Sequence, residues 1–252
     1  MFDHEILRAH GLFYPRPLAD ELVFETTLAP ANLVVEGSDP TKLSYELTNI
    51  QLEYKTIEAK GLASEAESTY LNGKDFFYED INRHKTITVR KDSDSIINEN
   101  INVPHRSIKG ILMLFSEPHA GGAKDSEKFF NPDITKVKVP INGVPNKVYS
   151  QGLKTRDAWK EIKRHFHRHR DESNMDATKF FTEDKFEFYI DLRSMADNNL
   201  HSSSLRLVNT KDGVLLEIER TPSGSGSMKC HIFIVSDAQF SILNRELHSI
   251  AN

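Results

Sequence analysis

NPDITKVKVPINGVPNKVYSQGL, residues Asn131–Leu153, contains the clearest structural signal of this chain. Apolar and polar residues alternate before Asn142-Gly143, and a second short extended run follows this pair. Asn-Gly between two such segments is typical of a two-residue hairpin turn, because both residues tolerate the positive φ angles of a type I′ turn. The stretch therefore predicts a β-hairpin centred on Asn142-Gly143.

Length and composition set the class of protein. The chain has 252 residues, of which 38% are hydrophobic and 27% are charged, and its net charge is −5. All-β sandwiches commonly exceed 200 residues as one domain, and the sequence contains no obvious linker or internal repeat. We therefore expect a single domain over residues 1–252, with residues 1–20 as an N-terminal arm. The negative charge argues against a general nucleic-acid-binding protein, which requires a basic face.

The cellular setting follows from cysteine usage and from the N-terminus. Cys230 is the single cysteine, so an internal disulfide framework is excluded and a reducing compartment is expected. The first ten residues, MFDHEILRAH, contain acids where a signal peptide is basic. No apolar run reaches the ~20 residues that a membrane helix requires. We expect an intracellular, soluble product, unless cells release it within a particle.

Extended segments dominate the rest of the chain. Alternating segments rich in Val, Ile, Phe, Tyr and Thr predict eight or nine strands. They are Leu22–Thr26, Ile50–Tyr54 with Leu43, Tyr45 and Leu47 before it, Thr86–Arg90, Ile108–Phe115, Lys136–Ile141, Phe186–Asp191, Val214–Arg220 and Cys230–Val235. Asp92–Asn102 and Glu117–Lys128 are typical of long loops, and Thr221–Ser227 of a flexible hairpin tip. The pattern favours an antiparallel β-sandwich of jelly-roll type.

Three segments have helical spacing. Ala59–Leu71 and Thr155–His169 each contain a narrow apolar stripe. We expect Trp159, in the second stripe, to be largely buried and to anchor its helix on the sandwich. The tail from Ser236 to Ile250 fits a capped helix and an extended strand equally well. The fold class is therefore mainly β, with two or three short inserted helices.

The run RHFHRHR at Arg164–Arg170 is the sharpest candidate for chemistry. His165 and His169 are one helical turn apart, a spacing at which two imidazoles can share Zn²⁺ or Ni²⁺. The wider segment Lys154–Arg170 has seven Lys or Arg residues against two Asp or Glu residues. We interpret it as a solvated basic helix end. Contact with an anionic partner, such as packaged nucleic acid, and metal binding are the two alternatives.

Cys230 and the glycine–serine tract have structural explanations. His231 follows Cys230 directly, and adjacent residues of a strand point to opposite faces, so the imidazole is badly placed to activate the thiol. Ser223–Ser227 reads SGSGS and matches neither a G-x-S-x-G nucleophile elbow nor a phosphate-binding loop. We predict a structural cysteine and a mobile turn.

The remaining polar candidates are equally weak. Asp191 and Arg193, with Asp197 nearby, suit a strand end followed by a turn better than a carboxylate cluster. His4 and His10 lie close to the chain end, which commonly frays. We therefore predict no catalytic, cofactor-binding or metal-binding residues, no cofactor, no small-molecule substrate and no enzymatic activity.

Five segments together resemble one family of viral shell proteins. The resemblance is to the C-terminal jelly roll of the double-jelly-roll major capsid proteins of Polinton (Maverick) elements and the related adintovirus-like viruses. None of the matching segments is a catalytic signature, so the specificity of the resemblance comes from the number of the segments and their order along the chain. The segments are Tyr45–Glu58, Asn102–Phe115, Asn131–Leu153, Phe188–Arg220 and Cys230–Ile250.

The resemblance implies a structural protein of an icosahedral shell. Members of the family form pseudo-hexagonal trimers in which each subunit contributes two upright jelly rolls. A chain of 252 residues supplies one roll, so it is a fragment or separate product, a single-roll relative, or a form without the N-terminal roll. The implied partners are further copies of the chain, other capsid subunits and a missing N-terminal roll, and the implied location is the virion. A non-enzymatic jelly-roll binding module and an element-derived host gene with another role are the alternatives.

Overall fold

A computed structural model gives the fold of most of the chain. It describes residues 23, 25–28, 30, 31, 35, 39, 42–51, 59, 61–102, 107–118, 128–145, 151–165, 176–193, 205–206, 213–244 and 246–250. Two compact units are present. Unit 1 consists of Met1–Glu79, His119–Ser126 and Ala238–Asn252, and unit 2 of Asp80–Pro118 and Glu127–Asp237. The proposed N-terminal arm, residues 1–20, lies outside the described residues, and the single-domain count stays a prediction.

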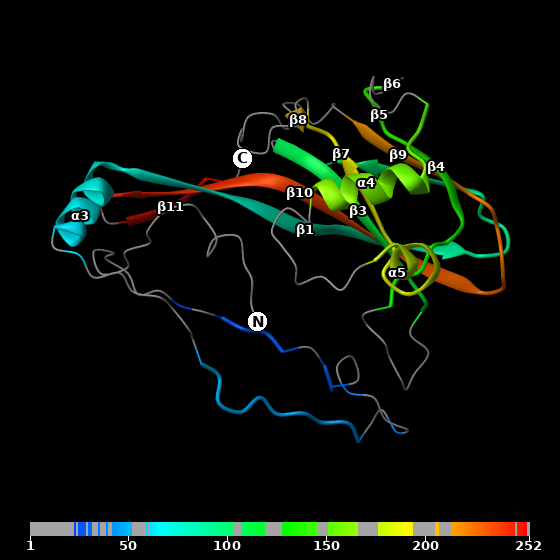
Figure 1. The fold of residues 1–252 in the computed structure, drawn as a ribbon, viewed down its shortest axis with the longest axis horizontal. Helices are drawn as coiled ribbons and strands as arrows, with labels where there is room; N and C mark the ends of the chain where they lie inside the picture. The colour runs from blue at the N-terminus through cyan, green and yellow to red at the C-terminus, as the bar shows by residue number, and fades with distance from the viewer. Residues whose placement is uncertain are drawn as a thin grey trace. The chain divides into compact units, whose positions relative to one another are not determined.

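The larger sheet contains six strands (Figure 1). Its central order is β1-β10-β3-β7, while β8 pairs with β3 and β11 pairs with β10. Where partner residues are assigned, the pairing is antiparallel. The strands are β1 (Lys74–Arg90), β3 (Ser107–Ser116), β7 (Glu187–Asp191), β8 (Leu205–Arg206), β10 (Ser227–Leu243) and β11 (Glu246–Ile250).

The smaller sheet contains five strands and is antiparallel throughout. β9 lies at its centre, with β2 on one side and β4 and β5 on the other, and β6 completes the order beside β5. The strands are β2 (Ile96–Ile101), β4 (Ile134–Lys138), β5 (Pro140–Ile141), β6 (Val144–Pro145) and β9 (Val214–Arg220).

The strand order of the two sheets is that of a jelly roll. Apart from the short β8 and β11, consecutive strands alternate between the sheets, with β4, β5 and β6, which all belong to the smaller sheet, as the exception. The first strand, β1, lies beside the last long strand, β10, in one sheet, and β2 lies beside β9 in the other. This arrangement winds an antiparallel ribbon into two facing sheets. The predicted fold class, a mainly β antiparallel sandwich of jelly-roll type, is confirmed.

The Asn-Gly hairpin is confirmed at its predicted position. Asn142 and Gly143 have φ angles of 52° and 75°, and they join Ile141 to its partner Val144. The Asn142 amide donates to the carbonyl of Gly213, and Asn142 Oδ1 accepts from the Gly213 amide. The turn is thereby fixed to the start of β9 as well as to its own two strands.

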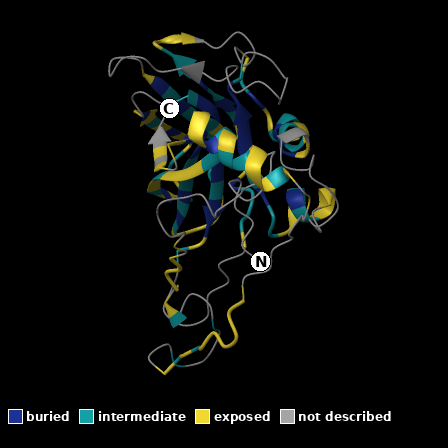
Figure 2. Ribbon diagram, turned by 90° about the vertical axis from the view of Figure 1, so that its left-hand side faces the viewer, coloured by how far each residue is buried: buried dark blue, intermediate teal, exposed yellow. Residues whose placement is uncertain are grey.

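The hydrophobic core of unit 2 lies between the two sheets. Residues of β3, β7, β9 and β10 that face one another are fully buried, and Figure 2 shows the buried residues concentrated in the strands. Burial of apolar area stabilises a fold by about 25 cal/mol per Å², so these side chains are the main source of stability. The largest in unit 2 are Tyr189, Phe115, Phe180, Phe186, Phe188, Ile101, Ile108, Ile111, Met113, Ile162 and Ile190.

Two helices close the side of this core. α4 (Thr155–His165) packs against β7 and β4, and α5 (Ala177–Thr182) follows it before β7. The predicted helix Thr155–His169 is thus confirmed as far as His165, and residues 166–169 lie outside the described part. Trp159 is partly buried and packs against the core, with its ring on Phe180 at a centroid distance of 4.7 Å, which agrees with the expected anchor of this helix, while Ala158 and Ile162 take the fully buried positions.

Unit 1 has a small aromatic core. α3 (Leu62–Asn72) confirms the helix expected at Ala59–Leu71, and its Tyr70 is buried against Phe76. Phe76 of β1 stacks on Phe240 of β10 with centroids 4.7 Å apart and an interplanar angle of 6°. Ile242 and Tyr78 complete this cluster. The helix therefore covers a short ribbon made from one end of β1, one end of β10 and β11.

Two loop predictions were wrong. Asp92–Asn102 was expected to be a loop, but it contains β2, in which Ile97 and Ile101 are buried and the residues between them are polar. Thr221–Ser227 was expected to be a hairpin tip, but it joins β9 of one sheet to β10 of the other. The few apolar residues of β2 hid its alternation, and strand pairing cannot be read from a turn sequence alone.

The structure also decides the ambiguous tail and tests the N-terminal strands. β10 and β11 pair with each other: Leu243 lies opposite Glu246 at one end of the pairing, and Gln239 lies opposite Ile250 at the other. The tail is therefore extended. Val23, Glu25 and Thr26 form no strand, and neither do the described residues Leu43–Gln51. The strand predictions at Leu22–Thr26 and Ile50–Tyr54 are wrong for these positions, while Leu22, Phe24 and residues 52–54 lie outside the described part.

β7 confirms the strand expected at Phe186–Asp191 but not its expected alternation of buried and exposed residues. Phe188, Tyr189, Ile190 and Asp191 are all buried. One set of side chains faces the core between the sheets, and the other set is covered as well. A strand that is covered on both faces loses the alternation of a half-buried strand.

Gly110 of β3 leaves room for the ring of Tyr189, which comes from the neighbouring strand β7 and lies against the Gly110 backbone. A Cβ atom at Gly110 would overlap this ring and would lie 2.6 Å from the Ile190 carbonyl oxygen. Gly110→Ala should therefore lower the free energy of unfolding by about 1–3 kcal/mol through overpacking. Gly213→Ala is the matched control, because nothing lies within 4 Å of its Cβ position. Urea unfolding of both variants checks this, and equal stabilities would contradict it.

Candidate functional site

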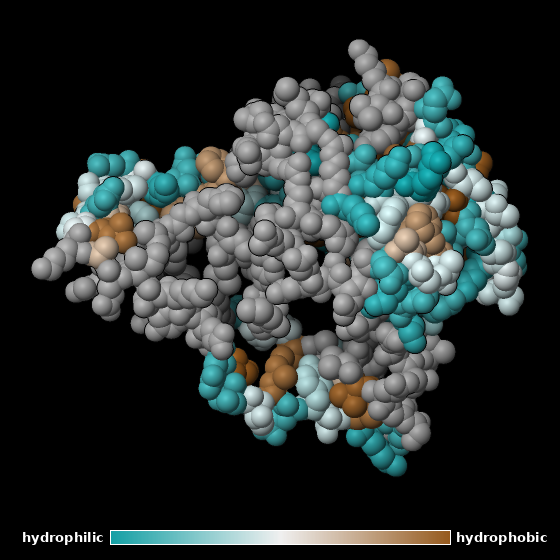
Figure 3. Space-filling model, in the orientation of Figure 1, coloured by the Kyte–Doolittle hydropathy of each residue, from teal (hydrophilic) through white to brown (hydrophobic). Residues whose placement is uncertain are grey.

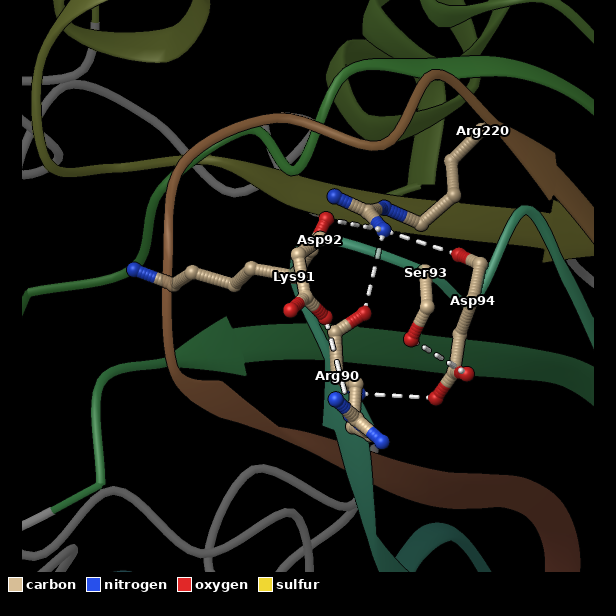
Figure 4. A network of polar contacts seen from close by, with 6 residues as sticks. All are labelled: Arg90, Lys91, Asp92, Ser93, Asp94 and Arg220. Atoms are coloured by element: carbon tan, nitrogen blue, oxygen red, sulfur yellow. Dashed lines mark hydrogen bonds and ion pairs between the residues drawn. The ribbon is translucent and has the colours of Figure 1, made fainter.

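A network of polar contacts in unit 2 surrounds Arg220, the last residue of β9 (Figure 4). Its side chain is buried, with 4% of the residue exposed. Nε donates to the Pro132 carbonyl at 2.9 Å, and Nη1 donates to the carbonyls of Asp94 at 2.8 Å, Lys91 at 3.2 Å and Arg90 at 3.4 Å. A planar guanidinium with five donors suits such a fan of acceptors.

These carbonyls belong to segments that pass between the sheets. Lys91–Ser95 joins β1 to β2, and Thr221–Gly226 joins β9 to β10. The amide of Lys91 donates to Gly226, and the amide of Ser223 donates back to Lys91. The amide of Thr221 donates to Asp133, just before β4. Arg220 therefore ties three neighbouring segments into one corner, which we call the crossing corner: residues 90–95, 131–133 and 220–226.

The glycine–serine tract Ser223–Ser227 is part of the crossing corner, and its contacts there show its structure. Ser223 Oγ donates to the Asp133 carboxylate at 2.6 Å, and Gly226 accepts from Lys91. Gly224 and Gly226 have φ angles of 76° and 86°, which glycine adopts without strain. The Ser223 hydroxyl, the Ser223 amide and the Gly226 carbonyl thus make internal contacts, and the expected turn is a connection fixed at both ends.

The solvent face of the smaller sheet carries a ladder of alternating charges. Lys138 of β4 contacts Glu217 at 3.0 Å and Glu219 at 2.8 Å, and Lys136 contacts Glu219 at 3.2 Å. The Lys138 ammonium lowers the pKa of Glu219, and the hydrogen bond to Glu219 raises the pKa of Lys138. Two lysines neutralise two glutamates, so this face lacks the excess positive charge that nucleic-acid binding requires.

His231 makes two hydroxyl contacts that the sequence analysis missed. Its Nε2 lies 2.9 Å from Ser116 Oγ, and its Nδ1 lies 3.0 Å from Thr86 Oγ1. In the active site of a serine hydrolase, the nucleophilic serine also makes a hydrogen bond of this length to a histidine. Here Ser116 is buried and the second ring nitrogen meets a hydroxyl instead of a carboxylate. The contacts connect β1, β3 and β10, so we assign the imidazole a structural role.

Cys230 points into the core, opposite in direction to His231, as expected for neighbours in a strand. It is fully buried, and this burial raises the pKa of its thiol. A thiol becomes reactive when its pKa is lowered, so this environment supports the predicted structural role.

Asp191 and Arg193 come together as a buried ion pair. Arg193 Nε donates to Asp191 Oδ1 at 2.9 Å, Nη2 contacts Oδ2, and the Arg193 amide also donates to Oδ1 at 3.0 Å. Both carboxylate oxygens are therefore engaged at the end of β7, in agreement with a strand end instead of an acidic cluster. Asp197 lies outside the described residues.

Burial in the fold shifts the pKa of the Glu187 carboxyl group. It lies on β7 opposite Leu114, and burial raises its pKa to about 7, although the nearby Lys185 charge acts in the other direction. The protonated form is therefore favoured by the fold at mildly acidic pH. This shift could not be predicted from the sequence, since the burial of one glutamate depends on tertiary packing.

The histidine-rich run is mostly outside the described residues. α4 reaches His165, but His4, His10, His167 and His169 are not described. Lys163 lies over the Trp159 ring, 4.5 Å from its centroid. Within the described residues, no group of three or more His, Cys, Asp or Glu side chains is placed to hold a metal ion. No helix in that part of the chain has the length and apolarity to cross a membrane.

Comparisons by sequence give no relatives. No family model matches the chain, and no curated protein matches it.

Comparisons by structure find viral capsid proteins. The mavirus major capsid protein is 10% identical, with a TM-score of 0.43, and the match covers 71% of this chain and 42% of that one. The PBCV-1 virus capsid is 8% identical, with a TM-score of 0.46 and coverages of 75% and 55%. The Sputnik virophage structure is 8% identical, with a TM-score of 0.39 and coverages of 71% and 39%. The chain thus spans about half, or less, of these solved chains, and the likeness concerns the fold alone.

Arg220 should be the most sensitive polar residue of unit 2. Arg220→Met removes the buried donor that four main-chain carbonyls share, and we expect the free energy of unfolding to fall by about 3 kcal/mol or more. Arg90→Ala is the control, because the Arg90 side chain is 69% exposed and its pair with Asp92 lies at the surface, so its loss should change stability by less than about 1 kcal/mol. Urea unfolding measures both, and an equal, small effect would refute the role of Arg220.

Proposed function

We propose that this chain is a structural jelly-roll building block of an icosahedral capsid, from a virus or a virus-like transposon of the Polinton and adintovirus type. The observation that carries the proposal is the strand order, β1-β10-β3-β7 facing β2-β9 with β4, β5 and β6. A fold alone does not define a function, so the order of the sequence phrases supplies the second argument.

Four of the five family-like phrases lie on the jelly roll in sequence order. Asn102–Phe115 covers most of β3, Asn131–Leu153 contains β4 to β6, Phe188–Arg220 runs from β7 to the end of β9, and Cys230–Ile250 contains most of β10 and all of β11. The sequence segments that resemble capsid proteins therefore coincide with strands of the two sheets.

The polar groups of the roll support a structural instead of a catalytic role. The Asp191–Arg193 pair, the hydroxyl contacts of His231 and the carbonyl contacts of Arg220 all connect elements of the fold to one another. We therefore propose a non-enzymatic protein without a cofactor, whose function is its shape and its contacts with further subunits.

The proposed partners are copies of this chain and other capsid subunits within the virion. Closed cyclic symmetry requires a heterologous interface, in which one surface patch meets a different patch on the next copy. We propose a trimer, with an upstream roll as a further partner. Any contact with nucleic acid is proposed only for the basic segment Lys154–Arg170.

Light scattering over a wide range of concentrations tests the proposal. The expected result is a rise from the monomer mass of 28.8 kDa to three times this mass, with larger closed assemblies at the highest concentrations. If the trimer requires the upstream roll, adding that roll should produce it. A monomer under both conditions that binds a glycan or another small ligand specifically would favour the binding-module alternative.

A further inference from the structure

α4 carries a row of positive charges on the face that points away from the core. Arg156, Lys160 and Lys163 are exposed, whereas Ala158 and Ile162 are buried. At 3.6 residues per turn, the three cations lie within an arc of about 60° and span about 10 Å along the helix axis. Figure 3 shows hydrophilic side chains gathered over this helix. We call Arg156, Lys160 and Lys163 the basic stripe.

The charges of the basic stripe are not neutralised within the described part of the chain. Arg156 and Lys160 form no ion pair there, and Lys163 lies over the Trp159 ring. The two acids of the helix, Asp157 and Glu161, lie to one side of the arc that the cations occupy. Lysines on β1, β3 and β4, by contrast, contact carboxylates. The stripe is therefore a local excess of positive charge on a chain whose net charge is −5.

The stability of the helix does not explain these positions. Arg156 lies in the first turn of α4, where the helix dipole favours acids over bases. Arg156 and Lys160 are also four residues apart, a spacing at which like charges destabilise a helix. An anionic partner on this face would remove both unfavourable effects.

The length of the basic stripe fits the phosphate backbone of nucleic acid. Phosphates on one strand of duplex DNA follow one another at about 3.4 Å along the axis, so a row of about 10 Å faces about three of them. Contacts between such cations and phosphates carry no base-sequence information. Base stacking is not expected, because the Trp159 ring is already in contact with Phe180 and Lys163.

An anionic membrane fits the same face less well. A helix that lies on a membrane inserts an apolar face beside its charges. The apolar face of α4 packs against β7 and β4, where Ala158 and Ile162 are buried. The exposed face thus offers charge without apolar area, which favours a nucleic acid.

We propose that the basic stripe of α4 binds the phosphate backbone of nucleic acid, whatever its base sequence. This inference rests on the proposed function, because the nucleic acid that a capsid subunit contacts is the packaged one. The contact is local and electrostatic, so it weakens steeply as the salt concentration rises.

Salt-dependent binding of duplex DNA tests this contact. Fluorescence polarisation follows two labelled duplexes of unrelated sequence between about 50 and 200 mM salt. Three phosphate contacts predict that the association constant falls by about 40-fold over this range, with a log–log slope of about −2.7, for both duplexes. The triple variant Arg156→Gln, Lys160→Gln, Lys163→Gln should lose a slope of about 2.7. The double variant Arg156→Gln, Lys160→Gln keeps Lys163 on Trp159 and should lose about 1.8.

A second triple variant is the matched control. Lys42→Gln, Lys85→Gln and Lys136→Gln together remove the same net charge, but from lysines that contact carboxylates. This control should bind the duplexes with the affinity and slope of the unmodified chain.

Four results would overturn the proposal. They are no binding at the lowest salt, binding of only one of the two sequences, unchanged binding by the α4 variants, and equal loss of binding by the α4 triple variant and the control. Binding to vesicles of phosphatidylserine and phosphatidylcholine without binding to DNA would also overturn it, and would favour a membrane.

Light scattering separates this inference from the proposed function. If trimers form but the duplexes are not bound, the α4 contact fails and the capsid role stands. If the duplexes are bound through α4 but the chain stays monomeric with and without the upstream roll, the proposed function fails and the α4 contact stands.

Discussion

A jelly roll must pass its chain repeatedly from one sheet to the other, and each passage leaves main-chain carbonyls without ladder partners. The guanidinium group of Arg220 satisfies this constraint at one end of unit 2 by donating to carbonyls of Arg90, Lys91, Asp94 and Pro132. Buried carbonyls require donors, and a charged donor strengthens each bond. Through these bonds one side chain holds the segments before β2, β4 and β10 together at this end of the two sheets.

Local patterns in the sequence were sufficient for the elements whose structure is fixed locally. Asn142-Gly143 predicted the hairpin because two positive φ angles are a property of the turn itself. β9 was predicted with its observed bounds because its sequence alternates regularly: all seven residues alternate between buried and partly exposed positions, and Val214, Leu216 and Ile218 take buried ones. Each of these signals extends over neighbouring residues only.

Features that depend on distant residues were not predictable in the same way. β2 carries three isoleucines among polar residues, and its strand character comes from pairing with β9, more than 110 residues later. The turn residues of Thr221–Ser227 predict a hairpin, because they do not reveal that the strands on either side belong to different sheets. Among the polar contacts, neither the Arg220 corner nor the contacts of His231 follow from spacing, since they join residues from three segments.

The central claim is that the crossing corner is one cooperative structure that closes the jelly roll, and native-state hydrogen exchange tests it most directly. The amides of Lys91, Thr221 and Ser223 donate to carbonyls of neighbouring segments in this corner. We expect these three amides to exchange with the same free energy of opening, close to that of the β3 and β9 amides. Rapid, independent exchange of the three amides, as in exposed loops, would contradict it.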